Sequence, residues 1–579
     1  MVKNRTMDKN ILSALLALET SSILSIIIFF SLIRPSFYYS KRVIFTCFFI
    51  TLLWFVVSVY SIIKRKKEKK GIKNYIVSSV IYFVVIFYMI RTVWFSSYLT
   101  LAPEYAFFNG LSHPDTLYLS TLCEAIKNFG YPALLSEGLE YHKYHYLSIV
   151  FLAVISKIVK IPCLITYNFL YPAVFFPLFI YLFFQAVGVV REYMKKNNYI
   201  SVTDVLFSLF VIIGYLPFRY LNLLFLGYSS AFLSESFCVS LILVLMYIVV
   251  IGLLKNKTNG KRTVNYLITL LFVFIITASK ISVGIIFSIY LGWFFIREEG
   301  ISLSSILLLA FGFIFLIFSL SLFNRNNQNI NEQSFVLFHF IKTYLPKKNI
   351  ISHLFFLVFP SFLLFLTAKG TAPYRSFYKT KESILAEASL VTVFFSVLPG
   401  ALFKIEGGSA AYFFLPALFI SLFLLLCFSR LQILFSKLIK EEKILIILLV
   451  LVLYGESLVY EPYYGSTLLK ATPREMIERY KQGRRDNRQV INSGFYKALT
   501  KINKMTEGKK KQYCLFVSDN CDIFKRYKGK YYFMKDKGLL AMSSYLGMPV
   551  ISDSEKAKEM HIENIIFLEK NTYRIVNLR

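Results

Sequence analysis

Acidic residues are scarce in this chain. It has 33 Asp and Glu against 65 Lys and Arg, and charged residues make up 17% of it, whereas soluble domains have about 25%. Cysteine is also rare, with 7 residues, and no CxxC, HExxH, Walker or GxGxxG pattern occurs. Nothing in the sequence therefore indicates an ATP-driven pump or a cytosolic nucleotide-sugar enzyme.

The chain is rich in long apolar blocks. Hydrophobic residues make up 56% of the chain, with blocks such as "VIFTCFFITLLWFVVSVYSII" and "LLLAFGFIFLIFSLSLF". One membrane-spanning helix needs about 20 apolar residues, so a polytopic α-helical membrane protein with about thirteen transmembrane helices is predicted. The net charge of +32 then indicates cytoplasmic loops rich in Lys and Arg, and no nucleic-acid partner is expected. The predicted spans lie at 11–33, 43–63, 75–96, 164–190, 201–218, 236–254, 264–279, 281–296, 301–323, 351–368, 384–403, 411–429 and 444–460.

The orientation of the chain depends on residues 147–160, "LSIVFLAVISKIVK". This piece is apolar but too short to span, which is typical of an interfacial or re-entrant helix. If it does not cross and the N-terminus is cytoplasmic, basic segments such as "KRKKEKKGIK" and "KNKTNGKR" all lie inside, as the positive-inside rule favours. The loop 97–163 and the C-terminus are then extracytoplasmic, in a multi-pass protein of the cell (inner) membrane.

The C-terminal residues differ in character from the rest. After a transmembrane domain at 1–460, residues 461–579 are polar and are predicted to form a small extracytoplasmic α/β domain. Its strands are expected at "YCLFVS", "PVIS" and "NIIFLE", with a helix at "GLLAMSSYLG" and amphipathic helices before them. Cys514 and Cys521 either form a disulfide or stay as free thiols, and the sequence leaves both alternatives open.

The loop 97–163 is predicted to contain functional residues. His113 precedes Pro114 and is therefore extended, which places Asp115 either as the N-cap of the helix "TLYLSTLCEAIKNFG" or as a functional carboxylate. Gly130 is expected to end that helix, and its apolar face is expected to lie along the membrane surface.

A second part of the same loop, "YHKYHY", contains His142, Lys143 and His145. The two histidines are three residues apart, which on a helix puts them on one face. Such a pair can bind a metal ion, but with no further clear ligand, hydrogen bonding to a phosphate or a sugar is the favoured interpretation.

Further ionisable residues fall at the predicted outer ends of spans. Charged groups there are costly unless they are hydrated or paired, so they are functional candidates. Each also has a simpler interpretation as a helix anchor, as a side chain reaching lipid head groups, or as an exposed ion pair. The candidates are Arg219, Glu235, Lys280, Lys404 and Glu406.

The order of these features resembles the GT-C-type superfamily of membrane glycosyltransferases that depend on polyprenyl-phosphate-linked sugars, in an uncharacterised bacterial branch. The pattern consists of "HPD" followed by "YHKYHY", then "FRYLNLLFLGYSSAFLSES", then "TASKISVG", and it covers roughly residues 75 to 300. The resemblance implies a GT-C-like fold. It also implies transfer of a sugar from the lipid-linked donor to a glycan, lipid or protein acceptor at the outer face, as part of cell-envelope polysaccharide synthesis.

The resemblance also implies roles for the candidate residues. Asp115 is the expected catalytic base. The family pattern often has two adjacent acids at this place, whereas this chain has only Asp115, so participation of a divalent cation such as Mg²⁺ or Mn²⁺ stays open. The substrate-binding residues, which hold the donor phosphate or orient the sugar and the acceptor, are His113, His142, Lys143, His145, Arg219, Glu235, Lys280, Lys404 and Glu406.

Two other classes of protein fit part of the pattern. A flippase or transporter of lipid-linked saccharides needs ionisable residues along a path through the bilayer, whereas most candidates here lie at one face. A polysaccharide polymerase, or a non-catalytic scaffold whose outer domain binds envelope partners, is the third alternative.

Overall fold

The computed structural model describes fifteen stretches of the chain, at residues 103–136, 138–142, 145–194, 235–257, 262–323, 358, 360–366, 368, 380–402, 411–428, 485, 488–517, 537–551, 558–569 and 572–578. These residues are mostly helical, with one small sheet. They fall into two compact units. We call residues 177–428 the helical unit, and residues 103–176 together with 485–578 the mixed unit.

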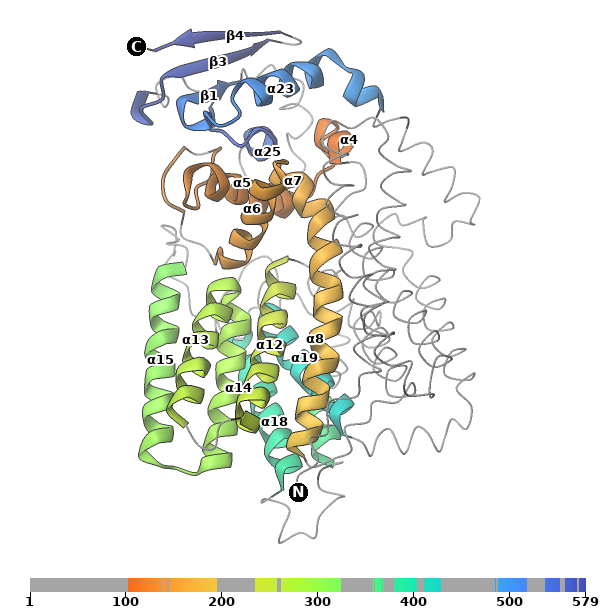
Figure 1. The fold of residues 1–579 in the computed structure, drawn as a ribbon, viewed down its shortest axis with the longest axis vertical. Helices are drawn as coiled ribbons and strands as arrows, with labels where there is room; N and C mark the ends of the chain where they lie inside the picture. Colours follow the sequence, from red (N-terminus) through yellow and green to blue (C-terminus); the bar gives the residue numbers. More distant parts are fainter. Residues whose placement is uncertain are drawn as a thin grey trace. The chain divides into compact units, whose positions relative to one another are not determined.

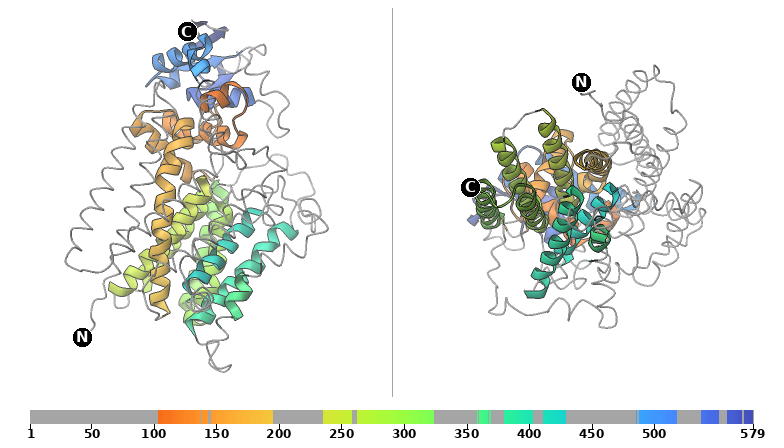
Figure 2. Two further views of the ribbon diagram at one scale, coloured as in Figure 1. Left: turned by 90° about the vertical axis from the view of Figure 1, so that its right-hand side faces the viewer. Right: turned by 90° about the horizontal axis from the view of Figure 1, so that it is seen from below.

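The helices of the helical unit run side by side, and most of its core is formed by large apolar side chains (Figures 1 and 2). Helix α13 packs on α12, α14 and α15, and α14 also packs on α18 and α19. The helices are α8 (Tyr171–Tyr193, whose first turns belong to the mixed unit), α12 (Glu235–Lys257), α13 (Arg262–Ser279), α14 (Ile281–Glu299), α15 (Leu303–Phe323), α18 (Lys381–Leu402) and α19 (Ala411–Cys427).

Among the described residues, three helices are long and apolar enough to cross a membrane: Glu235–Gly252, Ile281–Glu299 and Lys381–Leu402. Each coincides with a predicted span. The spans expected at 11–33, 43–63, 75–96, 201–218 and 444–460 lie outside the described residues, so the total of about thirteen stays a prediction. Large apolar side chains on α15, among them Phe311 and Phe313, are exposed, as expected of a helix that faces lipid.

The mixed unit combines short helices with a four-stranded sheet (Figure 1). Its helices are α4 (Pro103–Phe108), α5 (Pro114–Phe129), α6 (Leu147–Val159), α7 (Cys163–Ile165), the π-helical turn η1 (Thr166–Leu170), α23 (Gly494–Met505), the 3₁₀ turn η5 (Lys510–Gln512) and α25 (Lys537–Leu546). Ser493 starts α23 as the sequence pattern of a cap requires, because its hydroxyl accepts a hydrogen bond from the Tyr496 N–H at 3.2 Å.

The sheet confirms the predicted small α/β fold and extends it. Its strands are β1 (Tyr513–Phe516), β2 (Val550–Ile551), β3 (Asn564–Glu569) and β4 (Thr572–Asn577), in the order β2-β1-β3-β4. Strands β1, β2 and β3 are parallel and correspond to the three predicted strands, with α25 between β1 and β2 as expected. Strand β4, which pairs antiparallel with β3, was not predicted, because its alternation is weak and most of its side chains are exposed.

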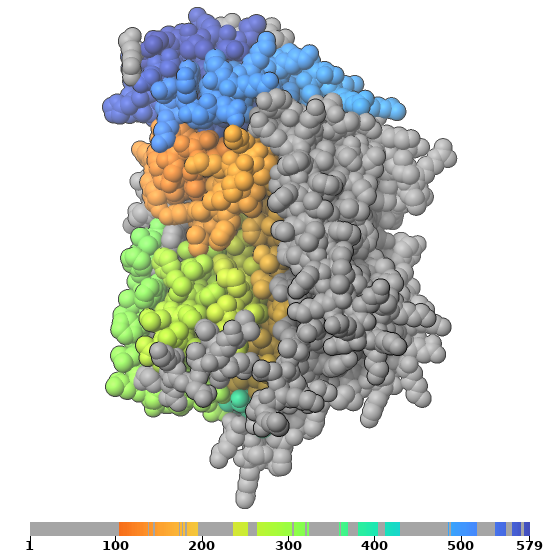
Figure 3. Space-filling model, in the orientation of Figure 1, coloured from red at the N-terminus to blue at the C-terminus, as the bar shows by residue number. Residues whose placement is uncertain are grey.

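Within the mixed unit, the described residues of the loop 97–163 pack directly on the C-terminal residues. In Figure 3 the blue surface of the C-terminal residues rests on the orange surface of the loop. Helix α5 contacts α25, and the Val550 N–H of edge strand β2 donates to the Leu135 carbonyl at 3.0 Å. The loop thereby satisfies part of an otherwise open sheet edge. The predicted separate folding of 461–579 stays a prediction; the structure adds that the loop covers this region.

This packing corrects the expectation that the apolar face of α5 lies along the membrane. The side chains of Leu117, Leu122 and Ala125 are fully buried, and the whole stretch from Thr116 to Ala125 is shielded. Helix α5 contacts α6, α7 and η5 as well as α25. An apolar helix face indicates burial, and the apolar face of α5 is buried by other helices of the mixed unit and not by lipid.

The apolar piece at 147–160 forms α6 and then turns sharply. Lys160 takes the left-handed conformation that ends the helix, and the next helical segment, Cys163–Leu170, is bent away by 112°. Such a pair is either a broken span or a re-entrant loop. The predicted re-entrant arrangement is compatible with this bend and stays a prediction.

The described cysteine of the C-terminal pair carries a free thiol. Cys514 is buried in β1, in a core with Ile551, Ile562 and Ile565. Burial raises the pKa of this thiol to about 12, so it stays protonated and behaves as a small apolar group. Cys521 lies outside the described residues.

Candidate functional site

The N-terminal turn of α5 is built by a histidine cap. His113 is extended (φ −67°, ψ 134°) and its Nδ1 accepts a hydrogen bond from the Asp115 N–H at 3.2 Å. Pro114 fits the first helical position because it has no N–H to satisfy. The predicted alternative in which Asp115 caps the helix is therefore wrong: the residue before the proline takes that role, and Asp115 lies inside the first turn.

The carboxylate of Asp115 consequently remains at the surface. Its side chain is 51% exposed, and one oxygen lies 3.9 Å from His113 Nδ1. A carboxylate in the first turn of a helix is favoured by the helix dipole. Asp115 is thus accessible, and a general base must lie within hydrogen-bond reach of the proton that it removes.

The histidine segment reaches the same turn of α5. His142 Nε2 is 2.7 Å from the Tyr118 hydroxyl, and the two rings meet edge to face. Tyr118 is three residues after Asp115 and therefore lies on the same side of the helix. The backbone N–H of His142 donates to the Pro132 carbonyl at 2.9 Å, which fixes the segment in place. Three predicted residues, His113, Asp115 and His142, thus gather around one helical turn; we call them, with Tyr118, the α5 cluster.

His145 is close to His142 in the chain, but the two histidines do not share a face of a helix. Helix α6 begins only at Leu147, so both His142 and His145 precede it, and the expected helical face with two histidines does not form. Tyr141 and Tyr146 flank the two histidines in the chain, and the Tyr141 hydroxyl donates a hydrogen bond to the Tyr146 hydroxyl at 3.4 Å. Burial, with a smaller contribution from that hydrogen bond, raises the pKa of Tyr141 to about 12, so it remains a neutral phenol.

Two further predicted residues lie at the starts of helices in the helical unit. Glu235 is the first residue of α12 and is 0% exposed, which confirms that an acid opens this helix. Lys280 separates α13 from α14, as predicted for a pair of short helices around a lysine, and its Nζ lies 4.3 Å from the centre of the Tyr412 ring. Phe237, two residues after Glu235, packs against the same ring at 6.3 Å.

These contacts place the start of α12, the α13–α14 turn and the start of α19 at one end of the helical unit. We call Glu235, Lys280 and Tyr412 the Lys280 cluster. A cation over an aromatic face contributes about 0.5–2 kcal/mol. The sequence had not singled out Tyr412 or Tyr118, although each is an aromatic residue close to predicted ionisable ones.

Several predicted residues lie outside the described part of the chain, namely Lys143, Arg219, Lys404 and Glu406. Within the described part, no three His, Cys, Asp or Glu side chains come together as a metal-binding group. The described members of each cluster instead offer carboxylates, imidazoles, phenols and one ammonium, which suit hydrogen bonding and proton transfer.

No family model, curated protein or solved structure matches this chain.

Proposed function

We propose that this protein is an inverting membrane glycosyltransferase of GT-C type, which moves a sugar from a polyprenyl-phosphate-linked donor to an acceptor at the outer face of the cell membrane. The observation that carries the proposal is the exposed Asp115 carboxylate. Because His113 makes the capping hydrogen bond, helix capping no longer accounts for an acid at position 115.

In the proposed reaction an acceptor hydroxyl attacks the anomeric carbon of the donor sugar. The bond from that carbon to the lipid phosphate breaks, and the phosphate leaves with the electron pair. Asp115 removes the proton from the attacking hydroxyl, and His142, held by Tyr118, hydrogen-bonds the sugar or the phosphate.

The developing charge on the leaving phosphate requires fixed cations. Lys280 has the required charge and is held in position by Tyr412. Arg219 and Lys404 are proposed for the same task, and Glu235 and Glu406 for orienting the acceptor or the sugar.

The test has two stages. The full chain is purified from its native membrane in lipid, and the bound lipids are analysed by mass spectrometry; a polyprenyl phosphate or its sugar-bearing form is expected. Sugar transfer by Asp115→Asn is then compared with that of Glu140→Gln, an exposed acid of the same loop that lies outside the α5 cluster. Loss of transfer in the first variant alone is expected, and unchanged transfer by Asp115→Asn would remove this residue as the base.

The donor-binding role is tested separately with Lys280→Ala. This change should weaken the use of the lipid-linked donor, seen as a raised KM, more than it lowers the thermal stability. An equal loss of transfer and stability would show that Lys280 only anchors the start of α14.

A further inference from the structure

The polar C-terminal residues carry a large excess of positive charge. Residues 461–579 contain 24 Lys and Arg against 13 Asp and Glu, which is +11 of the chain's net charge of +32. Basic residues in short loops follow from the orientation of the neighbouring spans, but most of this segment lies further from any predicted span than that rule reaches. By the predicted topology it also lies on the outer side of the membrane. This excess therefore needs another explanation.

Helix α23 presents part of this charge on one face. Lys497, Lys501 and Lys504 are exposed, and their spacing of four and three residues puts them along one side of the helix. At a rise of about 1.5 Å per residue, they form a row of about 10 Å. The opposite side contains the buried side chains of Leu499 and Ile502. We call the three lysines the α23 row.

The other side of α23 is packed into the mixed unit. The helix contacts α25 and β4, and the Tyr545 hydroxyl donates to the Tyr496 hydroxyl at 2.9 Å. The Phe495 ring meets the Phe108 ring edge to face, with 5.9 Å between their centres. The apolar and aromatic side chains of the helix are thus used in packing, and they hold the α23 row on a fixed surface.

The positive charge continues on both sides of the α23 row. Arg485 and Arg488 precede it and Lys509 and Lys511 follow it, and all four are exposed, whereas Glu507 is the one exposed acid among the described residues of 485–512. The first two lysines of the row make no ion pair with any described residue. The undescribed residues of 461–579 contain 13 Lys and Arg against 9 Asp and Glu, so their charge adds to the excess.

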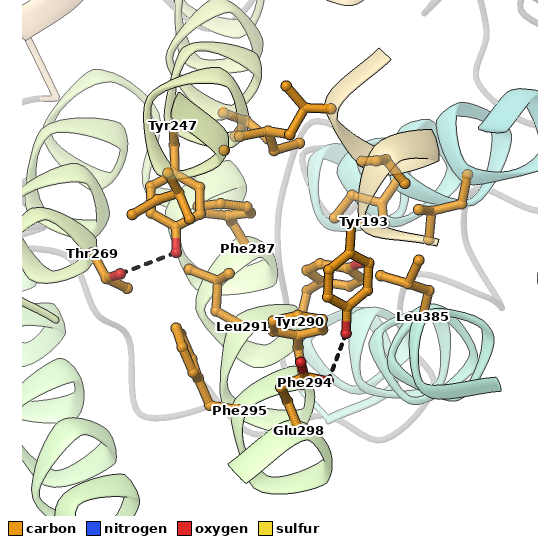
Figure 4. A pocket seen from close by; sticks show the side chains of 18 of the residues that line it. Tyr193, Tyr247, Thr269, Phe287, Tyr290, Leu291, Phe294, Phe295, Glu298 and Leu385 are labelled. Carbon is orange, nitrogen blue, oxygen red and sulfur yellow. Dashed lines mark hydrogen bonds between the residues drawn. The ribbon is translucent and has the colours of Figure 1, made fainter. Parts of the chain in front are cut away.

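The shape of this surface suits an extended partner. Small ligands are usually enclosed by concave sites, whereas the α23 row lies on the convex side of a helix. The cavity drawn in Figure 4, about 840 Å³ in volume, is of the enclosing kind, but it belongs to the helical unit. Tyr193, Tyr247 and Phe287 are among its lining residues, and none comes from α23. The α23 row instead offers positive charges in succession to a chain that lies along it.

We propose that the α23 row and its basic flanks bind a linear anionic polymer of the cell envelope, with one anionic group on each repeat unit. Such a chain gains affinity by releasing its condensed counterions as each ammonium neutralises one of its charges. A single-stranded nucleic acid would need exposed aromatic rings for its bases, and a lipid surface would need a free apolar helix face. In α23 both are occupied by packing. The proposal rests on the predicted outer location of residues 461–579 and not on sugar transfer.

The experiment uses the full chain in nanodiscs of phosphatidylcholine, with fluorescein-labelled poly(glycerol phosphate) as the probe. Binding is followed by fluorescence anisotropy between about 50 and 200 mM NaCl, where affinity for a linear polyanion should fall steeply. Labelled dextran of matching length is the uncharged control and should not bind. Failure of the poly(glycerol phosphate) to bind, or equal binding of dextran, would overturn the proposal.

A pair of double variants tests the helix itself. Each neutralised charge contributes about 0.7 to the slope of log affinity against log salt, so Lys497→Gln with Lys501→Gln should reduce this slope by about 1.4. The matched control is Lys157→Gln with Lys558→Gln, which removes two exposed lysines of the mixed unit from other elements. The control should keep the original slope. An unchanged slope in the α23 variant, or the same reduction in both, would show that the α23 row is not the binding surface.

Competition distinguishes the polymer from other polyanions. At equal phosphate concentration, unlabelled poly(glycerol phosphate) should displace the probe more effectively than phosphatidylglycerol vesicles or single-stranded DNA. Stronger displacement by the vesicles would assign the surface to an anionic membrane, and stronger displacement by the DNA would assign it to nucleic acid; either result would overturn the proposal. All of these readouts are binding, so they are independent of whether sugar transfer is found.

Discussion

Glu124 helps to connect α5 and α7 to the C-terminal residues, and replacing it tests how the mixed unit is held together. The side chain is 2% exposed. Its carboxylate accepts from the Cys163 N–H at 2.6 Å and from the Asn128 amide at 3.0 Å, and it pairs with Lys127 at 3.3 Å. Asn128 in turn donates to the Gly547 carbonyl at 2.9 Å. One carboxylate thus connects α5, α7 and the turn after α25.

The change Glu124→Gln keeps the size of the side chain and one acceptor oxygen but removes the charge. Lys127, whose side chain is only 17% exposed, then loses its counter-ion and keeps the Ile161 carbonyl at 2.8 Å. Removing one partner of a buried pair costs about 3–5 kcal/mol. Because Lys127 retains that carbonyl, we expect the lower end, about 3 kcal/mol, which corresponds to roughly a hundredfold rise in the opened population.

Hydrogen exchange measured by mass spectrometry on the full chain in nanodiscs detects this opening. Amides of α25 and β2 should exchange about a hundredfold faster in Glu124→Gln, while amides of α12 and α14 should not change. Glu559→Gln, an exposed acid of the same unit, is the control and should behave as the unaltered chain. Unaltered exchange of α25 in Glu124→Gln would refute the conclusion that this carboxylate holds the loop to the C-terminal residues.

Two further predictions concern a buried lysine and a buried glycine. Burial lowers the pKa of Lys510 from 10.5 to about 7, so between these values the unfolded chain binds a proton that the folded chain has released. Stability of the mixed unit should therefore rise with pH across this window, and Lys510→Met should flatten the rise in melting temperature; an unchanged slope would contradict this. A Cβ at Gly284 would lie 2.1 Å from Thr277 Oγ1 and 2.6 Å from its Cα, so Gly284→Ala should destabilise the α13–α14 pair by about 1–3 kcal/mol in thermal melts. Gly312→Ala, with open space around it inside α15, is the control and should be neutral or slightly stabilising; equal melting of the two variants would contradict the close packing.

Local features of the sequence predicted local structure well. The apolar runs at 236–254, 264–279 and 281–296 correspond to α12, α13 and α14 within a few residues, because their length and their flanking polar residues define both ends. Gly130 ends α5 in the left-handed conformation, as a glycine before Tyr131 and Pro132 indicates.

Features that depend on distant contacts were missed or misread. The apolar face of α5 indicated burial correctly, but the sequence could not say that α25, over 400 positions away, supplies the cover. Residue preference made Asp115 one candidate for the N-cap, yet the helix starts two residues earlier than that alternative requires, at Pro114, and the imidazole of His113 takes the role. Tyr118 and Tyr412 were overlooked because aromatic residues are abundant throughout this chain.

The distribution of ionisable residues along α12, α13 and α14 favours an enzyme over a flippase. Between Glu235 and Lys255, between Arg262 and Lys280, and from Lys280 to Arg297, these helices contain no Asp, Glu, Lys or Arg. Several hydroxyls along the way donate to carbonyls of their own helix, as when Thr277 donates to the Val273 carbonyl at 2.7 Å.

Moving a sugar chain through the bilayer along these helices would need polar groups at successive depths to replace the lost water. Here Lys280 and the carboxylates Glu298 and Glu299 lie at opposite ends of α14, with an apolar stretch between them. Such an arrangement suits two separate sites, one for each end of the helices, better than one continuous path. Introducing Asp at Ile286, midway along α14, should therefore destabilise the protein without opening a route, and saccharide uptake into proteoliposomes by the unaltered chain would contradict this interpretation.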